Sequence, residues 1–173
     1  NIVLVGPMGA GKSTVGRYLA SRLSYHFVDT DHLIEERTGA DIPWIFDVEG
    51  EAGFRARETS ILDSLQQVSR HVIATGGGIV VRPENHSRLK ALGKVIYLTA
   101  SVEQLLARTS KDKKRPLLQV ADPRAKITQL LQERGALYQQ LADLTVQTDG
   151  RSSKWVVQQV MQWLNSHSVT PIG

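Results

Sequence analysis

The chain has 173 residues, of which 41% are hydrophobic and 22% charged, and its formal net charge is +4. This length predicts one domain, residues 1–173, and the chain has no apolar run near the ~20 residues that a membrane-spanning helix needs. The sequence contains no cysteine, which excludes disulfides and thiolate metal sites. A reducing compartment fits that composition, so we expect a cytoplasmic protein.

The excess of positive charge allows two interpretations. An isoelectric point near 9.5 is compatible with nucleic-acid binding, but no run of basic residues alternates with aromatic ones, as a groove for single strands requires. A positive field also speeds the encounter of an enzyme with anionic substrates. We favour the second interpretation and expect neither nucleic acid nor a membrane as a partner.

Five short apolar runs alternate with segments of helical periodicity. The strands are predicted over 2–5, 26–29, 71–74, 94–98 and 144–147, and the helices over 12–23, 31–38, 51–68, 84–92, 102–108, 124–141 and 152–165. This alternation predicts a three-layer α/β/α fold, in which helices cover both faces of a five-stranded parallel sheet. Ligands of such a sheet bind beyond the carboxyl ends of its strands.

Two segments fit neither periodicity. Residues 39–50 contain Pro43, Trp44, Ile45 and Phe46, and we interpret them as a short helix that packs as a hydrophobic plug. Residues 109–122 are polar and basic around a Pro-Leu-Leu sequence, which predicts a long surface loop, and such loops are often lids. We therefore expect a helical substrate-binding insert within about 31–92 and a lid at about 109–123.

The most informative motif follows the first predicted strand. Residues 6–13 read Gly-Pro-Met-Gly-Ala-Gly-Lys-Ser, the G-x-x-x-x-G-K-[ST] pattern of a P-loop, and they stand between a strand and a helix as that loop requires. Glycines let backbone N–H groups surround phosphate oxygens, while the lysine reaches the β- and γ-phosphates and the serine binds Mg²⁺. A flexible glycine-rich turn is the alternative, but both flanks favour binding of a nucleoside triphosphate. The expected ATP-binding residues are Gly9, Ala10, Gly11, Lys12, Ser13 and Thr14.

Two carboxylates follow the second predicted strand, in Val28-Asp29-Thr30-Asp31. One acid near Ser13 can hold the water shell of the metal, and the other can accept a proton from a substrate hydroxyl. The alternative is that one of these residues simply caps the next helix. The P-loop favours the functional interpretation.

The third predicted strand runs into Thr75-Gly76-Gly77-Gly78 and not into an aspartate. Consecutive glycines leave backbone amides open to a ligand. The usual Walker B acid is therefore missing here, which makes Asp29 the candidate for the metal. Asp149, after the last strand, resembles a Walker B acid, but we interpret it as a loop residue.

Two arginines are candidates for binding anions, and a third, Arg134, indicates no function by itself. Arg55 precedes Glu58 by three residues, so an intrahelical pair can orient its guanidinium toward a carboxylate ligand, although a solvated helix surface is the alternative. Arg115 lies beside Pro116 in the predicted lid, where closure would deliver its charge to a transferring phosphoryl group. Arg134 lies in an otherwise apolar helical segment.

Taken together, these motifs resemble those of the shikimate kinase family. They are a Walker A motif without a Walker B acid, Asp-Thr-Asp, Gly-Phe-Arg-x-Arg-Glu, the glycine triplet, Arg-Pro-Leu-Leu and Glu-Arg-x-x-Leu-Tyr, and they extend over essentially the whole chain. Each is weak alone, but six in this order are specific. The resemblance implies a fold similar to nucleoside monophosphate kinases, and a monomer that transfers the γ-phosphoryl group of ATP, with Mg²⁺, to the 3-hydroxyl of shikimate.

The resemblance also implies roles for the substrate-binding residues. Asp31 is expected to contact the shikimate hydroxyls and to act as the base, and Arg55 and Arg134 to bind the shikimate carboxylate. The glycine triplet, Gly76, Gly77 and Gly78, is expected to provide backbone contacts. Gly135-Ala136 stands where family members commonly have a proline before Leu-Tyr, which is the one visible departure.

On the nucleotide side, the resemblance assigns Lys12 and Arg115 to the transferring phosphoryl group. Ser13 and, through water, Asp29 are expected to hold Mg²⁺, and Arg108 and Arg151 to lie near the adenine, with Arg115 also contacting ATP. Two rivals remain: another small-metabolite or nucleotide kinase of the same fold, and an ATP-dependent switch or nucleic-acid-binding module. A small anionic polyol requires both guanidinium groups and an acid, whereas a nucleotide acceptor requires neither.

Overall fold

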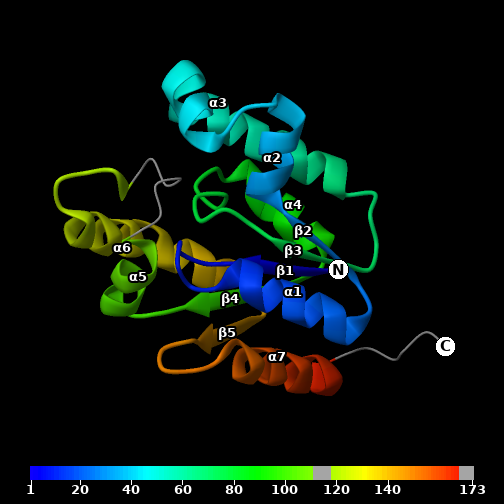
Figure 1. Ribbon diagram of the computed structural model, residues 1–173. Helices are drawn as coiled ribbons and strands as arrows, with labels where there is room; N and C mark the ends of the chain where they lie inside the picture. Colours follow the sequence, from blue (N-terminus) through cyan, green and yellow to red (C-terminus); the bar gives the residue numbers. More distant parts are fainter. Residues whose placement is uncertain (111–117, 168–173) are drawn as a thin grey trace.

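Five parallel strands form one sheet in the computed structural model, which describes residues 1–110 and 118–167 (Figure 1). The order across the sheet is β2-β3-β1-β4-β5. The strands are β1 (Ile2–Val5), β2 (His26–Asp29), β3 (His71–Ala74), β4 (Lys94–Thr99) and β5 (Leu144–Gln147). All five predicted strands are confirmed, and only β4 is longer than predicted, by one residue.

Seven helices accompany the sheet within the described residues. They are α1 (Lys12–Leu23), α2 (Thr30–Thr38), α3 (Ile42–Leu65), α4 (Glu84–Leu92), α5 (Val102–Thr109), α6 (Pro123–Leu141) and α7 (Ser153–His167). Six of them agree with the prediction to within two residues at each end. None of the helices in the described ranges combines the length and the apolar character needed to cross a membrane.

The sheet separates two apolar cores, because successive residues of each strand point to opposite faces. On one face Val3 and Val5 belong to a cluster with residues of α3, α4 and α6. On the other face Ile2 and Leu4 belong to a cluster with residues of α1, α5 and α7. The predicted three-layer α/β/α fold is therefore confirmed.

Helix α3 is the one element that the sequence pattern placed wrongly. It begins at Ile42, nine residues before the predicted start, and it ends at Leu65, not at residue 68. Gly50 interrupts it with φ 72° and ψ 178°, so residues 42–49 form a separate first arm. The hydrophobic-plug interpretation is right for Ile45, which is buried, and wrong for Trp44, which is 58% exposed.

Helices α2 and α3 stand away from the sheet beyond the carboxyl ends of β1, β2 and β3 (Figure 1). This is the placement expected of a substrate-binding insert. The lid was predicted from residue 109, but Thr109 still belongs to α5, and its hydroxyl donates to the Leu105 carbonyl at 2.7 Å. The rest of that prediction, including Arg115, lies largely in residues 111–117, outside the described residues.

Candidate nucleotide and substrate site

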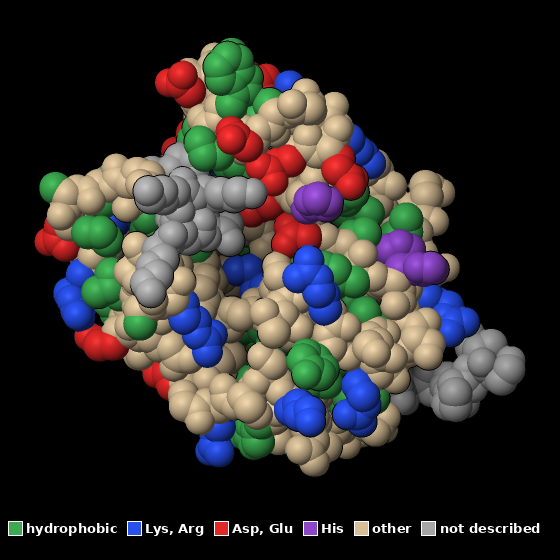
Figure 2. All heavy atoms as spheres, viewed as in Figure 1, with side chains coloured by type: hydrophobic (Ala, Val, Ile, Leu, Met, Phe, Trp, Pro, Cys, Tyr) green, Lys and Arg blue, Asp and Glu red, His purple; other side chains and the backbone are tan. Residues whose placement is uncertain are grey.

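A cavity of about 150 Å³ opens at the carboxyl ends of β1, β2 and β3. Its lining combines the loop after β1, the two acids after β2 and the loop after β3: Met8, Gly9, Gly11, Lys12, Ser13, Thr14, Asp29, Asp31, Thr75, Gly76 and Gly77. A hollow with basic side chains inside it and acidic ones above it is visible in Figure 2. The three motifs that the sequence separates by up to about 70 residues therefore meet at one edge of the sheet, as expected for a parallel sheet.

Three glycines of the loop after β1 have a backbone conformation that other residues rarely adopt. Gly6, Gly9 and Gly11 have φ values of +146°, +84° and +93°. A Cβ on Gly6 would lie 2.1 Å from the Leu98 carbonyl oxygen, so no larger residue fits there. The backbone thus forms a P-loop that leads into the N-terminus of α1, where N–H groups without helical partners favour an anion.

Lys12 bends back across this loop. Its Nζ donates hydrogen bonds to the carbonyls of Gly6 at 2.7 Å and Pro7 at 2.8 Å, and the residue is only 9% exposed. The cationic group is thereby held over the backbone amides that would surround a phosphate.

Asp29 caps α2, the alternative that the sequence left open, and it also contacts the P-loop serine. Its Oδ1 caps α2 by accepting from the N–H groups of Asp31 at 2.9 Å and His32 at 3.3 Å. Its Oδ2 accepts from the Ser13 hydroxyl at 2.6 Å. The cap fixes the carboxylate beside the P-loop serine, so one residue both begins the helix and completes the polar end of the cavity.

The hydroxyl and carboxylate of Ser13 and Asp29 suit Mg²⁺ in a nucleotide complex. Mg²⁺ in such sites usually has one or two protein ligands and completes its octahedron with water and phosphate oxygens. Among residues 1–110 and 118–167, no group of three or more histidine, aspartate or glutamate side chains could hold a metal alone. At such a site, phosphate oxygens of the nucleotide and water would supply the remaining ligands.

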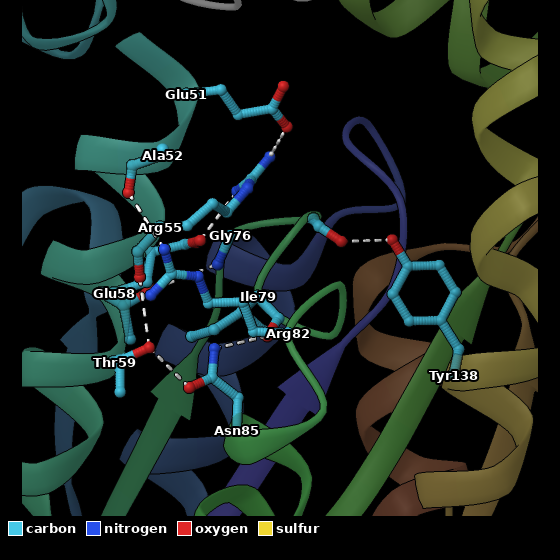
Figure 3. Close-up of polar contacts among 12 residues, drawn as sticks. Glu51, Ala52, Arg55, Glu58, Thr59, Gly76, Ile79, Arg82, Asn85 and Tyr138 are labelled. Atoms are coloured by element: carbon cyan, nitrogen blue, oxygen red, sulfur yellow. Dashed lines mark hydrogen bonds and ion pairs between the residues drawn. The ribbon is translucent and has the colours of Figure 1, made fainter. Parts of the chain in front are cut away.

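Arg55 and Glu58 form a buried ion pair on α3 (Figure 3). Arg55 Nη1 lies 2.7 Å from Glu58 Oε1, and the two residues are 5% and 0% exposed. Arg55 Nη2 also donates to Glu51 Oε1 at 3.1 Å, near the solvent. The predicted intrahelical pair is confirmed, and the interpretation as a solvated helix surface is wrong. Arg57, by contrast, pairs with Glu49 on the exposed side of the helix.

The surroundings of this pair shift both pKa values. Burial raises the pKa of Glu58 to about 7, because the opposing charge of Arg55 does not fully compensate and the nearby Asp31 adds repulsion. The second oxygen of Glu58, Oε2, has no hydrogen-bond partner within the described part of the chain, which makes its ionised form more costly. Burial lowers the pKa of Arg55, but Glu58 and Glu51 outweigh it and leave the pKa raised.

The glycine triplet is required by the charged side chains that pack on it. A Cβ on Gly78 would lie 2.3 Å from Arg55 Nη2, and one on Gly76 would lie 2.6 Å from Asp31 Oδ1 and 3.1 Å from Glu58 Oε2. The triplet thus lets Asp31 and the Arg55–Glu58 pair approach the backbone and each other. The motif alone does not predict that these side chains converge on one loop.

Arg134 and Tyr138 approach the same loop from α6. Arg134 is 5% exposed, and its Nη1 lies 3.7 Å from the position of a Cβ on Gly77. The Tyr138 hydroxyl donates to the Gly77 carbonyl at 2.5 Å (Figure 3), and burial raises its pKa to about 12. Tyr138 had no predicted role of its own, although an aromatic residue four positions after Arg134 was a signal present in the sequence.

Two further residues that hold the loop escaped sequence reasoning. Asn85 is fully buried, accepts from the Thr59 hydroxyl at 2.8 Å and donates to the Ile79 carbonyl at 2.9 Å (Figure 3). These contacts join α3 and α4 to the end of the glycine-rich loop. Nothing in the local pattern marks them, because Thr59 and Asn85 are 26 residues apart.

The arginines predicted near the adenine lie in different surroundings. Arg108, at the end of α5, donates from Nη1 to the Gly9 carbonyl at 3.0 Å and so touches the P-loop. Arg151 is exposed and lies over the ring of Trp155, 4.4 Å from its centroid. Asp149 is a loop residue as predicted, and its carboxylate accepts from the Ser101 N–H at 2.9 Å.

Comparison with known proteins agrees with this geometry. A profile described as shikimate kinase matches residues 8–165. The chain belongs to the shikimate kinase family. Shikimate kinases of Vibrio cholerae and Vibrio parahaemolyticus are 54% and 57% identical to it, over 96% and 95% of both chains.

Solved structures extend the comparison to three dimensions. A shikimate kinase from Acinetobacter baumannii, solved in complex with shikimate, is 48% identical and has a TM-score of 0.95 over 98% of this chain and 95% of its own. A deoxyadenosine kinase from M. mycoides is 17% identical over 95% of this chain and 98% of its own, with a TM-score of 0.65, and shares the fold alone. Both agree with the family fold implied by the motifs.

Proposed function

We propose that this protein transfers the γ-phosphoryl group of ATP to the 3-hydroxyl of shikimate and yields shikimate 3-phosphate and ADP. One observation carries the proposal: two nearly buried guanidinium groups, of Arg55 and Arg134, converge with Asp31 on a glycine-rich loop that adjoins a P-loop. A ligand that needs this set has a carboxylate and hydroxyl groups and lies beside a triphosphate. The shikimate bound to the Acinetobacter baumannii relative has that chemistry.

In this proposal the two arginines orient the shikimate, and Asp31 removes the proton from its reacting hydroxyl. Arg55 and Arg134 bind the substrate carboxylate, since their planar groups suit two parallel hydrogen bonds to it. The backbone of the glycine triplet, Gly76, Gly77 and Gly78, contacts the substrate, although the Gly76 N–H itself donates to the Thr30 hydroxyl at 3.1 Å. Asp31 accepts the hydroxyl proton as the oxygen attacks the γ-phosphorus, which gives the attack its direction.

ATP is bound in the proposal by the backbone of residues 9–14, with Lys12 at the phosphates and Arg108 and Arg151 toward the base. Ser13 and, through water, Asp29 hold Mg²⁺, which when bound offsets the charge that develops on the phosphate oxygens. Arg115, in the predicted lid, adds positive charge to the transferring group as it closes. We propose a monomer in the cytoplasm.

The experiment is substrate-dependent release of ADP, measured with shikimate, gluconate and nucleoside monophosphates as acceptors. We expect turnover with shikimate alone. Turnover with a nucleoside monophosphate or gluconate but not with shikimate would replace the proposal with another kinase of the same fold.

A further inference from the structure

A side-chain bridge joins the P-loop to the loop after β5. Gln104, on α5, lies between the carboxylate of Asp149 and the guanidinium of Arg108, with its amide nitrogen toward the acid and its amide oxygen toward the arginine. The nitrogen donates to Asp149 Oδ1 at 2.8 Å, and the oxygen accepts from Arg108 Nε at 3.3 Å and from Nη2. The charges on either side leave only this orientation of the amide with both ends satisfied.

Both ends of this bridge are anchored in the backbone. Asp149 also accepts from the Ser101 N–H, at the start of α5, so the acid fixes the β5 loop to the helix. Arg108 donates from Nη1 to the Gly9 carbonyl at 3.0 Å. In Figure 1, α5 and the loop after β5 lie at the same end of the sheet as the P-loop.

The contact at Gly9 is close-packed. A Cβ on Gly9 would meet Thr109 Cγ2 at 3.0 Å, the Leu105 carbonyl at 3.3 Å and Arg108 Cβ at 3.5 Å. Arg108 Nη1 lies 3.3 Å from the position of a Cβ on Gly11. The last turn of α5 is therefore the surface on which the P-loop rests, and the Arg108 guanidinium lies over the segment from Gly9 to Gly11.

We propose that Gln104 is a positioning residue for the nucleotide, which holds the Arg108 guanidinium over the P-loop while leaving its charge available. This inference rests on the proposed use of ATP. Among residues 1–110 and 118–167, both acceptors of Arg108 are neutral, namely the Gln104 amide and the Gly9 carbonyl, which leaves its positive charge to an anionic ligand. A glutamate at position 104 would neutralise that charge and would also face the Asp149 carboxylate.

The test is the affinity for a fluorescent ADP analogue, measured directly by titration, together with KM for ATP and for shikimate. We expect Gln104→Glu to weaken nucleotide binding about five- to ten-fold, the size of one partly exposed charge-assisted hydrogen bond. Gln104→Met, which keeps the length of the side chain but not its amide, should weaken it about three-fold. KM for shikimate should change less than two-fold in both variants.

Glu103→Gln is the matched control, because it removes an exposed ion pair with Arg124 from the adjacent position of the same helix. It should leave both affinities unchanged. The proposal is overturned if Gln104→Glu binds the analogue like the wild type, if both substrates are affected equally, or if the control has the same effect. Since nucleotide binding is measured without any acceptor, a wrong assignment of shikimate would leave this result intact.

Discussion

Glu58 makes the stability of this protein depend on pH in a predictable direction. Its pKa of about 7 in the folded chain is above the ordinary value of 4.5. The folded state therefore holds this proton more tightly than the unfolded state does. The stability that protonated Glu58 contributes is fully present below about pH 4.5 and is lost as the pH rises through about 7.

The size of the effect follows from the shift. One pKa unit corresponds to about 1.4 kcal/mol, so the titration of Glu58 lowers the free energy of unfolding by about 2–3 kcal/mol between pH 5 and pH 8. Glu58→Gln removes this titration, because glutamine stays neutral and resembles the protonated acid. The free energy of unfolding of the variant, relative to that of the wild type, should rise by the same amount over this range.

Urea denaturation followed by circular dichroism at pH 5, 6, 7 and 8 measures this difference. The two proteins differ only at position 58, so the rest of their pH dependence is common to both and cancels in the difference. Glu49→Gln is the control, since the Arg57 hydrogen bond lowers the pKa of Glu49 and moves its titration below this window. A difference between wild type and Glu58→Gln that stays constant from pH 5 to pH 8 would refute the reasoning, whatever its absolute size.

Three further predictions concern the site. Arg55→Ala should raise the Kd for shikimate at least ten-fold and that for ATP less than two-fold, because it removes a proposed charged partner of the shikimate carboxylate. Calorimetric titration of each ligand checks this, and equal losses of affinity for both ligands would contradict the proposed role of Arg55. Arg115→Ala should lower kcat more than it weakens shikimate binding, since the proposed contact of Arg115 with the transferring phosphoryl group strengthens mainly in the transition state. An unchanged kcat in steady-state assays would rule this out. Gly78→Ala should raise KM for shikimate, because its Cβ would lie 2.3 Å from the Arg55 guanidinium, whereas Gly135→Ala, with nothing within 4 Å, should keep full activity. Thermal denaturation should show that Gly135→Ala stabilises the protein by about 1 kcal/mol, and a loss of stability would mean that the helix at Gly135 is strained.

The parallel sheet was predictable because its central strands, β1, β3 and β4, are largely buried. Such strands appear as continuous apolar runs, and Ile2–Val5 is followed at once by Gly6, which ends it. Helix α3 was not predictable to the same degree. Its first arm has Pro43 in the first turn, where a helix tolerates proline, and Gly50 then breaks the φ/ψ pattern without ending the helical path. Gly50 therefore indicated a boundary where the chain makes only a kink.

For the site, the pair of Arg55 and Glu58 within one helix was predictable, but partners on different elements were not. At Asp29 the helix cap is confirmed, and the cap leaves the second carboxylate oxygen free to accept from Ser13 on another element. A short motif identifies a residue by what stands beside it in the chain. It gives no information on a second carboxylate oxygen that accepts a hydrogen bond from another element.

Long-range contacts between loops were beyond the sequence for a different reason. The Gln104–Asp149 contact exists because β4 and β5 are neighbours in the sheet, where Thr99 pairs with Gln147. That pairing brings the start of α5 and the loop after β5 together, and only then does a glutamine between an acid and an arginine acquire a meaning. Asp149 resembled a Walker B acid in sequence, but the sheet order β3-β1-β4-β5 places it two strands from the P-loop strand. Its carboxylate contacts Gln104, which in turn contacts Arg108 over the P-loop, so its link to that loop follows from the sheet topology and not from the motif.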